Sequence, residues 1–296
     1  MAAGTTVSGV IVPATRRHYE RLVSLVADVR ADAPDSVHRM RVAARRMRSL
    51  LGTFSDAFPP AATVTVRGEL RWLGGILGAA RDAEVLAGRF GDLIDAQPPD
   101  LLLGSVHQRL VGVQEDMYRA AHARILEVFD GPRFAALCAL LDEVTSGDHP
   151  VPEGSTVRGG LDAAYRQLRT AYRKVPGRPD VDDGADDTAA ALHRVRKRAK
   201  KVRYAAEAVS DAEPSAAALA TAAESLQTLL GAHQDGVLAR ARILDAVARA
   251  RADDEDTFAY GVLYAADRAR TVRAADELPG RVRAIRKAYR HLGFRR

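Results

Sequence analysis

The feature that most limits the fold is a repeat of two short motifs in the same order. Residues 37–48 contain the pattern His-x-x-Arg-x-x-x-Arg-Arg-x-Arg, and residues 192–203 repeat it at an offset of 155 with lysines in place of the adjacent arginines. A Leu-Gly motif over residues 77–82 recurs over residues 230–235, at an offset of 153. Two motifs at nearly constant spacing favour an internal duplication into two similar halves.

Hydrophobic periodicity predicts that both halves are helical. Apolar residues recur three and four positions apart, while the alternation typical of strands is nearly absent. The break over residues 146–155 is rich in Pro, Gly and Ser, and it predicts a boundary between an N-terminal helical half, 1–150, and a C-terminal helical half, 151–296. The fold class is therefore all-α. Helices are expected at 15–31, 36–57, 61–78, 83–96, 101–129, 132–146, 156–174, 188–210, 214–231, 235–252 and 255–293.

The two repeated helices concentrate positive charge. On a helical wheel, His38, Arg41, Arg45 and Arg48 form one stripe beside the apolar face, and the second half repeats this stripe. Of the 44 Lys and Arg residues, 12 lie in residues 36–51 and 193–203, which contain no acid. The chain carries a formal charge of +6, so the remainder is net negative by six charges. Like charges at this spacing destabilise a helix, which favours an anion-binding face over a merely solvated one.

The composition of these stripes indicates phosphates without bases. Neither stripe carries the Asn or Gln side chains that read base edges. Tyr204 is the single aromatic residue in residues 36–51 and 192–207, and we expect it to pack rather than to stack on bases. The stripes therefore predict recognition of phosphates alone, without readout of bases.

The two motifs resemble the signatures of the CHAD family, the "conserved histidine α-helical domain". The resemblance implies two pseudo-symmetric helical bundles with a shared basic groove, and binding of inorganic polyphosphate at polyphosphate granules in bacterial cells. It does not extend to the hydrolase domain fused to some members, so no enzymatic activity and no cofactor are expected. The implied polyphosphate ligands are His38, Arg41, Arg45, Arg46, Arg48, His193, Arg196, Lys197, Lys200, Lys201 and Arg203, with Arg81, Arg166 and Arg173 as secondary candidates.

Two alternative functions stay open at this point. A nucleic-acid or nucleoid-associated binder would use the same cations. A metal-dependent phosphohydrolase would need a ligand set such as His38, His193 and His233, but these lie on separate segments without the spacing of a metal site. Asp82 and Asp235, after their glycines, are interpreted as helix N-caps rather than as catalytic carboxylates.

Other features limit the compartment. Cys138 is the only cysteine, so a disulfide framework is excluded. The first residues lack the basic and apolar regions of a signal peptide, and no apolar stretch is long enough for a transmembrane helix. We expect a cytoplasmic protein without a membrane partner.

Overall fold

The computed structural model describes residues 6–147, 155–175 and 186–293, and within them it has no β-strand. The expected division at 146–155 falls largely on residues outside this description. The α-helices are α1 (Val7–Arg30), α2 (Ser36–Thr53), α3 (Pro60–Asp95), α4 (Val113–Asp130), α5 (Pro132–Val144), α6 (Val157–Arg173), α7 (Asp186–Val209), α8 (Ala216–Ala252) and α9 (Phe258–Arg290).

Two pairs of expected helices are single long helices. The segments 61–78 and 83–96 lie within α3, and 214–231 and 235–252 lie within α8. The predicted breaks at the Leu-Gly motifs are therefore wrong. A glycine inside a helix costs about 1 kcal/mol relative to alanine. In α3 this cost is offset by a continuous buried face, on which Leu73, Leu77 and Ala80 are all fully buried.

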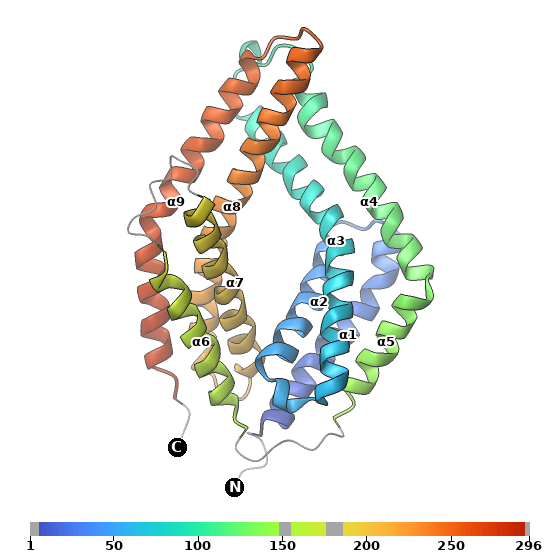
Figure 1. The fold of residues 1–296 in the computed structure, drawn as a ribbon, viewed down its shortest axis with the longest axis vertical. Helices are drawn as coiled ribbons and strands as arrows, with labels where there is room; N and C mark the ends of the chain where they lie inside the picture. Colours follow the sequence, from blue (N-terminus) through green and yellow to red (C-terminus); the bar gives the residue numbers. More distant parts are fainter. Residues whose placement is uncertain (1–5, 148–154, 176–185, 294–296) are drawn as a thin grey trace.

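The helices form two groups with a similar local order (Figure 1). In the first group α2 packs between α1 and α3, and in the second α7 packs between α6 and α8. Thr6 and Thr156 cap α1 and α6 in the same way, because each hydroxyl accepts the N–H of the glycine three residues later. The backbones of these two threonines also pair across the halves. This Thr-Val-x-Gly element is a further likeness between the halves, in addition to the two repeated motifs.

The two groups are joined at both ends of the molecule. Near the chain termini, one hydrophobic core contains buried residues of both halves. At the opposite end, the second half of α3 packs against α8, α9 and the segment before α4 in a separate core. There the fully buried carboxylate of Asp267 on α9 pairs with Arg89 of α3 at 2.5 Å and with Arg240 of α8 at 2.9 Å. The two halves are thereby held around a central space.

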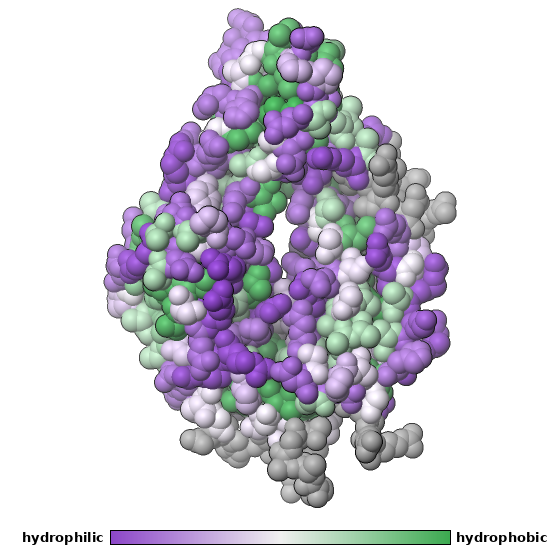
Figure 2. Space-filling view, turned by 180° about the vertical axis from the view of Figure 1, so that it is seen from behind, coloured by the Kyte–Doolittle hydropathy of each residue, from purple (hydrophilic) through white to green (hydrophobic). Residues whose placement is uncertain are grey.

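The surface between the halves is hollowed, and mainly hydrophilic side chains border the hollow (Figure 2). A core-facing helix normally turns its polar side to bulk solvent. Here the polar sides of α2 and α7 turn toward each other instead, because α2 and α7 are themselves in contact. The fold thus brings the two repeated helices, 155 residues apart in sequence, to one site.

Candidate functional site

Side chains of α2 and α7 meet across the two halves. Arg45 Nε donates a hydrogen bond of 2.9 Å to the Tyr204 hydroxyl, and Lys201 Nζ donates one of 3.3 Å to the carbonyl of Gly52. Arg46 forms an ion pair of 3.0 Å with Glu207. The two repeated helices therefore meet through these three side-chain contacts.

A cluster of cations surrounds a cavity of about 560 Å³ between α2, α3 and α7. We call it the polybasic cavity. Its lining contains eight Lys and Arg residues and no Asp or Glu. The remaining lining residues are Ser49, Gly52 and Tyr204. The eight cations are Arg45, Arg48, Arg67, Arg71, Lys197, Arg198, Lys200 and Lys201.

Burial and mutual repulsion perturb the cations of this cavity. Burial is the main cause that lowers the pKa of Lys200 to about 7; nearby Arg45, Arg196 and Arg41 contribute to this lowering, while Asp235 acts in the opposite direction. Burial also lowers the pKa of Arg48, assisted by the guanidinium groups of α3. Cations held together without carboxylates favour an anion that supplies the missing negative charge.

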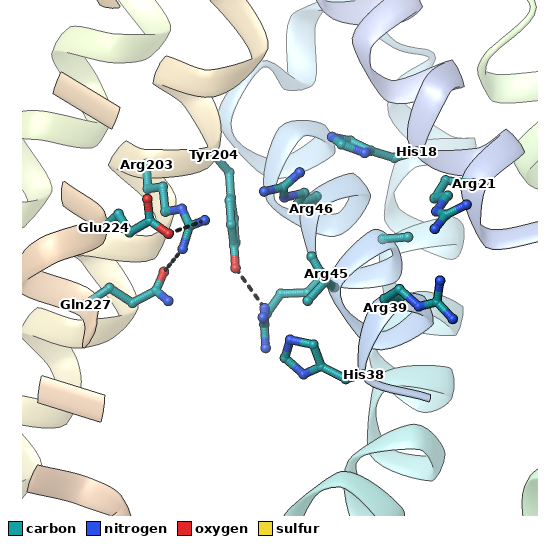
Figure 3. A pocket seen from close by; sticks show the side chains of 12 residues that line it. His18, Arg21, His38, Arg39, Arg45, Arg46, Arg203, Tyr204, Glu224 and Gln227 are labelled. Atoms are coloured by element: carbon teal, nitrogen blue, oxygen red, sulfur yellow. Dashed lines mark hydrogen bonds and ion pairs between the residues drawn. The ribbon is translucent and has the colours of Figure 1, made fainter. Parts of the chain in front are cut away.

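A second cavity of about 450 Å³ shares Arg45 and Tyr204 with the polybasic cavity, and its lining is drawn in Figure 3. We call it the histidine cavity, because His18 of α1 and His38 of α2 line it. Burial lowers the pKa of His18 to about 4, with help from Arg46 and Arg17. Burial and Arg81 also lower the pKa of His38. The lining residues are His18, Arg21, His38, Arg39, Val42, Ala43, Arg45, Arg46, Arg203, Tyr204, Glu224 and Gln227.

Tyr204 lines both of these cavities. It is buried, with 3% of its surface exposed, as the expected packing role requires. In addition, three guanidinium groups, those of Arg45, Arg46 and Arg203, lie 5.6–5.9 Å from its ring centre. Such distances allow cation–π attraction, so the ring stabilises the positive charge of these three side chains.

We expect Tyr204→Phe to lower the free energy of unfolding by about 1–3 kcal/mol, because it leaves the partly buried Nε of Arg45 without its acceptor. Urea denaturation measures this change. Tyr165→Phe is the matched control, because Tyr165 stacks on Tyr289 but its hydroxyl makes no hydrogen bond in the described structure. Equal losses in the two variants would contradict a role for the Tyr204 hydroxyl.

The predicted site residues divide according to their partners. Of the eleven, those that line the polybasic cavity are Arg45, Arg48, Lys197, Lys200 and Lys201. Arg46 and Arg203 line the histidine cavity but are engaged by acids: both pair with Glu207, and Arg203 also pairs with Glu224 at 2.8 Å. His38 lines the same cavity, and its Nδ1 is buried without a hydrogen-bond partner.

Arg41 and Arg196 lie against the glycines of the Leu-Gly motifs. A Cβ atom on Gly78 would lie 3.6 Å from the Arg41 guanidinium, and one on Gly231 would lie 3.1 Å from that of Arg196. These glycines therefore allow a close approach of an arginine in each half, rather than breaking the helix.

The acids of the Leu-Gly motifs are not N-caps, because Asp82 and Asp235 lie inside α3 and α8. The N-cap interpretation depended on helix breaks that do not exist. Asp82 instead pairs with Arg41 at 3.5 Å. Gln234, which stands where the first half has Arg81, accepts a hydrogen bond of 2.8 Å from Nδ1 of His193. That substitution explains why His193 has a partner while His38 has none at this nitrogen.

The secondary candidates differ in position. Arg81 is engaged by Glu84 at 2.9 Å and by Asp35 at 3.7 Å. Arg166 lines a third cavity of about 830 Å³ between α6 and α7, which shares Lys197 and Arg198 with the polybasic cavity. Arg173 is exposed and lines none of these three cavities.

Several lining residues were absent from the sequence prediction. Arg67 and Arg71 of α3 join the polybasic cavity, while His18 and Arg21 of α1 join the histidine cavity. Each pair lies three or four residues apart on one helix face, which is a detectable signal. These residues have no counterpart in the two repeated motifs, however, and the predicted ligands came from those motifs.

Among the described residues, no three His, Cys, Asp or Glu side chains lie close enough to share a metal ion. Within the same part of the chain, no helix combines the length and hydropathy needed to cross a bilayer.

The sequence of this chain is similar to those of known proteins. The model of the CHAD domain family matches residues 13–244. Two Mycobacterium tuberculosis proteins, named "Uncharacterized protein MT2285" and "Uncharacterized protein Rv2226", are each 37% identical over 286 residues, which cover 94% of this chain and 53% of theirs. The chain thus spans about half the length of these curated relatives.

Two solved structures share the fold. PptA from Streptomyces chartreusis superposes with a TM-score of 0.67 at 19% identity, covering 97% of this chain and 99% of that one. A CHAD domain from the plant Ricinus communis superposes with a TM-score of 0.69 at 24% identity, covering 99% and 94%. At such identities, the likeness establishes the all-α fold.

Proposed function

This chain belongs to the CHAD domain family, and we propose that it binds inorganic polyphosphate in the cleft between α2 and α7 without catalysing a reaction on it. The observation that carries the proposal is the polybasic cavity, where eight cations and no acid surround one space. Arginine and lysine bind phosphate oxygens through charge-assisted hydrogen bonds, which are about twice as strong as neutral ones.

The arrangement of the cavities supports a linear ligand. The histidine cavity and the polybasic cavity share Arg45 and Tyr204, and the polybasic cavity shares Lys197 and Arg198 with the third cavity. Cations therefore follow one another from α1 to α6. A flexible chain of phosphates can contact successive cavities, and each contact adds affinity without a new association step.

The same site lacks what a nucleic acid requires. Bases of a single strand stack on exposed aromatic rings. The aromatic residue of this site, Tyr204, is buried, and its ring is already flanked by guanidinium groups. The second candidate, a nucleic-acid binder, therefore has cations for the backbone but no surface for the bases.

A thermal-shift titration with long-chain polyphosphate tests the proposal. A ligand at a hundred times its dissociation constant stabilises the folded state by about 2.7 kcal/mol, which corresponds to a rise of several degrees in melting temperature. Sodium sulfate at equal ionic strength is the control. A shift no larger than that of sulfate would overturn the proposal, and so would full displacement of polyphosphate by duplex DNA at equal phosphate concentration.

Two expectations depend on the proposed function. A fluorescent fusion of the chain should co-localise with polyphosphate granules in bacterial cells. Incubation with polyphosphate should release no inorganic phosphate, with or without divalent metal. Metal-dependent release that is lost in His38→Ala would instead support the phosphohydrolase alternative.

A further inference from the structure

The chain uses arginine almost exclusively as its cation, and its few lysines are clustered. Only five of its 44 basic residues are lysines, and three of them, Lys197, Lys200 and Lys201, line the polybasic cavity. Lys200 occupies the position of the repeat that Arg45 holds in the first half. Arginine is the better phosphate ligand because its guanidinium is bidentate and always charged. A lysine at this position therefore binds phosphate less well than an arginine would, but its amine can lose a proton, which a guanidinium in a protein does not do.

The surroundings of Lys200 favour the neutral amine. Among the described residues, its Nζ has no hydrogen-bond partner and no carboxylate within ion-pair distance. The charged groups that face it are Arg41 and Arg45 of α2, Arg196 of α7 and Asp235 of α8. With a pKa of about 7, roughly half of this amine is neutral at pH 7. For an ordinary lysine the neutral fraction is roughly one in 2,500.

We propose that Lys200 is an acyl-accepting lysine, and that the polybasic cavity directs small acyl phosphates to it. The phosphoryl group of such a compound offers the oxygens that the guanidinium groups of Arg48 and Arg71 bind. The cavity, at about 560 Å³, has room for a small acyl phosphate beside the lysine. A nucleophile and its electrophile are then held in one space, which is the geometry that accelerates group transfer.

The transfer is balanced without a further reactant. The lone pair of the neutral Lys200 Nζ attacks the carbonyl carbon, and an N–C bond forms. The bond between the carbonyl carbon and the oxygen that bridges to phosphorus breaks, and its electron pair leaves with the phosphate. The proton lost by nitrogen passes to the departing phosphate or to water. The products are an uncharged amide at Lys200 and inorganic phosphate, and the neighbouring arginines stabilise the negative charge that develops on the leaving group.

Acylation would weaken polyphosphate binding, because it removes one cation from the polybasic cavity. Bound polyphosphate should in turn protect Lys200, since both ligands use the same guanidinium groups. These two consequences rest on the proposed function. The acyl transfer itself requires only that the cavity binds a phosphoryl group, whatever the length of its natural ligand.

The experiment uses the full chain, acetyl phosphate as the probe, and peptide mass spectrometry to measure the acetylation rate of each lysine. Lys287, exposed on α9, is the internal comparator. At pH 7 we expect acetylation of Lys200 to be at least about tenfold faster than that of Lys287, since the gain in neutral amine exceeds the loss of nucleophilicity that accompanies a lower pKa. Equal rates would overturn the proposal.

An uncharged reagent separates phosphate capture from simple reactivity. With N-hydroxysuccinimidyl acetate, the preference for Lys200 over Lys287 should be several-fold smaller than with acetyl phosphate. Arg48→Gln should reduce the preference only with acetyl phosphate, and Lys200→Arg should abolish the modified peptide. The same preference with both reagents would refute the directing role of the cavity. If Lys200 is acetylated selectively but polyphosphate gives no protection, the proposed function fails and this inference stands.

Discussion

The triple substitution Arg48→Glu, Arg71→Glu and Lys200→Glu is expected to reduce polyphosphate affinity by about a thousandfold or more. None of these three side chains has an acidic partner in the described structure, so the change breaks no ion pair. Each lost charge-assisted contact is worth about 1.5 kcal/mol, and three together give roughly three powers of ten. Binding to immobilised polyphosphate at physiological ionic strength measures the effect, and far-ultraviolet circular dichroism checks that helicity is retained.

The matched control is Arg283→Glu, Arg286→Glu and Arg290→Glu on α9. These residues are exposed, lie outside the three cavities, and change the net charge by the same amount. Their replacement should leave affinity within a fewfold of the unmodified chain. An equal loss in both variants would mean that overall charge, or the basic C-terminal segment, accounts for binding instead of the polybasic cavity.

The second large effect concerns stability. Lys200→Met is expected to raise the melting temperature of the ligand-free protein by about 3–6 °C near pH 6.5, because it removes a buried cation that repels its neighbours. The pKa of Lys200 is about 7 in the folded chain, and it is about 10.4 for an unfolded lysine. The destabilisation is therefore fully present below pH 7, and it disappears as the pH rises toward 10.

Comparison of the variant with the unmodified chain across pH isolates this group, since all other titrating side chains are common to both. The difference in melting temperature should shrink toward zero between pH 7 and pH 10. Lys287→Met, at an exposed position of α9, should show no such pH dependence. A variant that melts no higher than the unmodified chain at pH 6.5 would show that the site does not strain Lys200. The same Lys200→Met variant should bind polyphosphate less tightly. The substitution would therefore raise stability and lower affinity for the proposed ligand.

Local sequence patterns predicted most of the helices and the basic stripes. Helical periodicity places Val37, Met40 and Met47 on one face, and all three are buried in the structure. The same periodicity placed Arg45 and Arg48 beside that face, where they line the polybasic cavity. These predictions succeed because side-chain direction along a helix depends only on residue spacing.

Residue spacing could not predict whether the helices continue through the Leu-Gly motifs. The tendency of Gly78 to interrupt α3 is a local cost, whereas the burial of Leu73 and Leu77 that outweighs it comes from other helices packed against α3. The error about the helix ends then produced the error about Asp82 and Asp235. Long-range packing decides such cases, and it is not encoded in a short window.

The sequence by itself determined that the chain is all-helical, that it repeats a basic helix, and that its positive charge is concentrated there. Only the tertiary structure decided which of these cations are paired with acidic side chains and which line a cavity without acids. Arg46 and Arg203 are engaged by Glu207, while Arg67 and Arg71 of α3 join Lys200 around a space without acids. The physical reason is that charge pairing depends on distances through space, which are set when α2, α3 and α7 pack together.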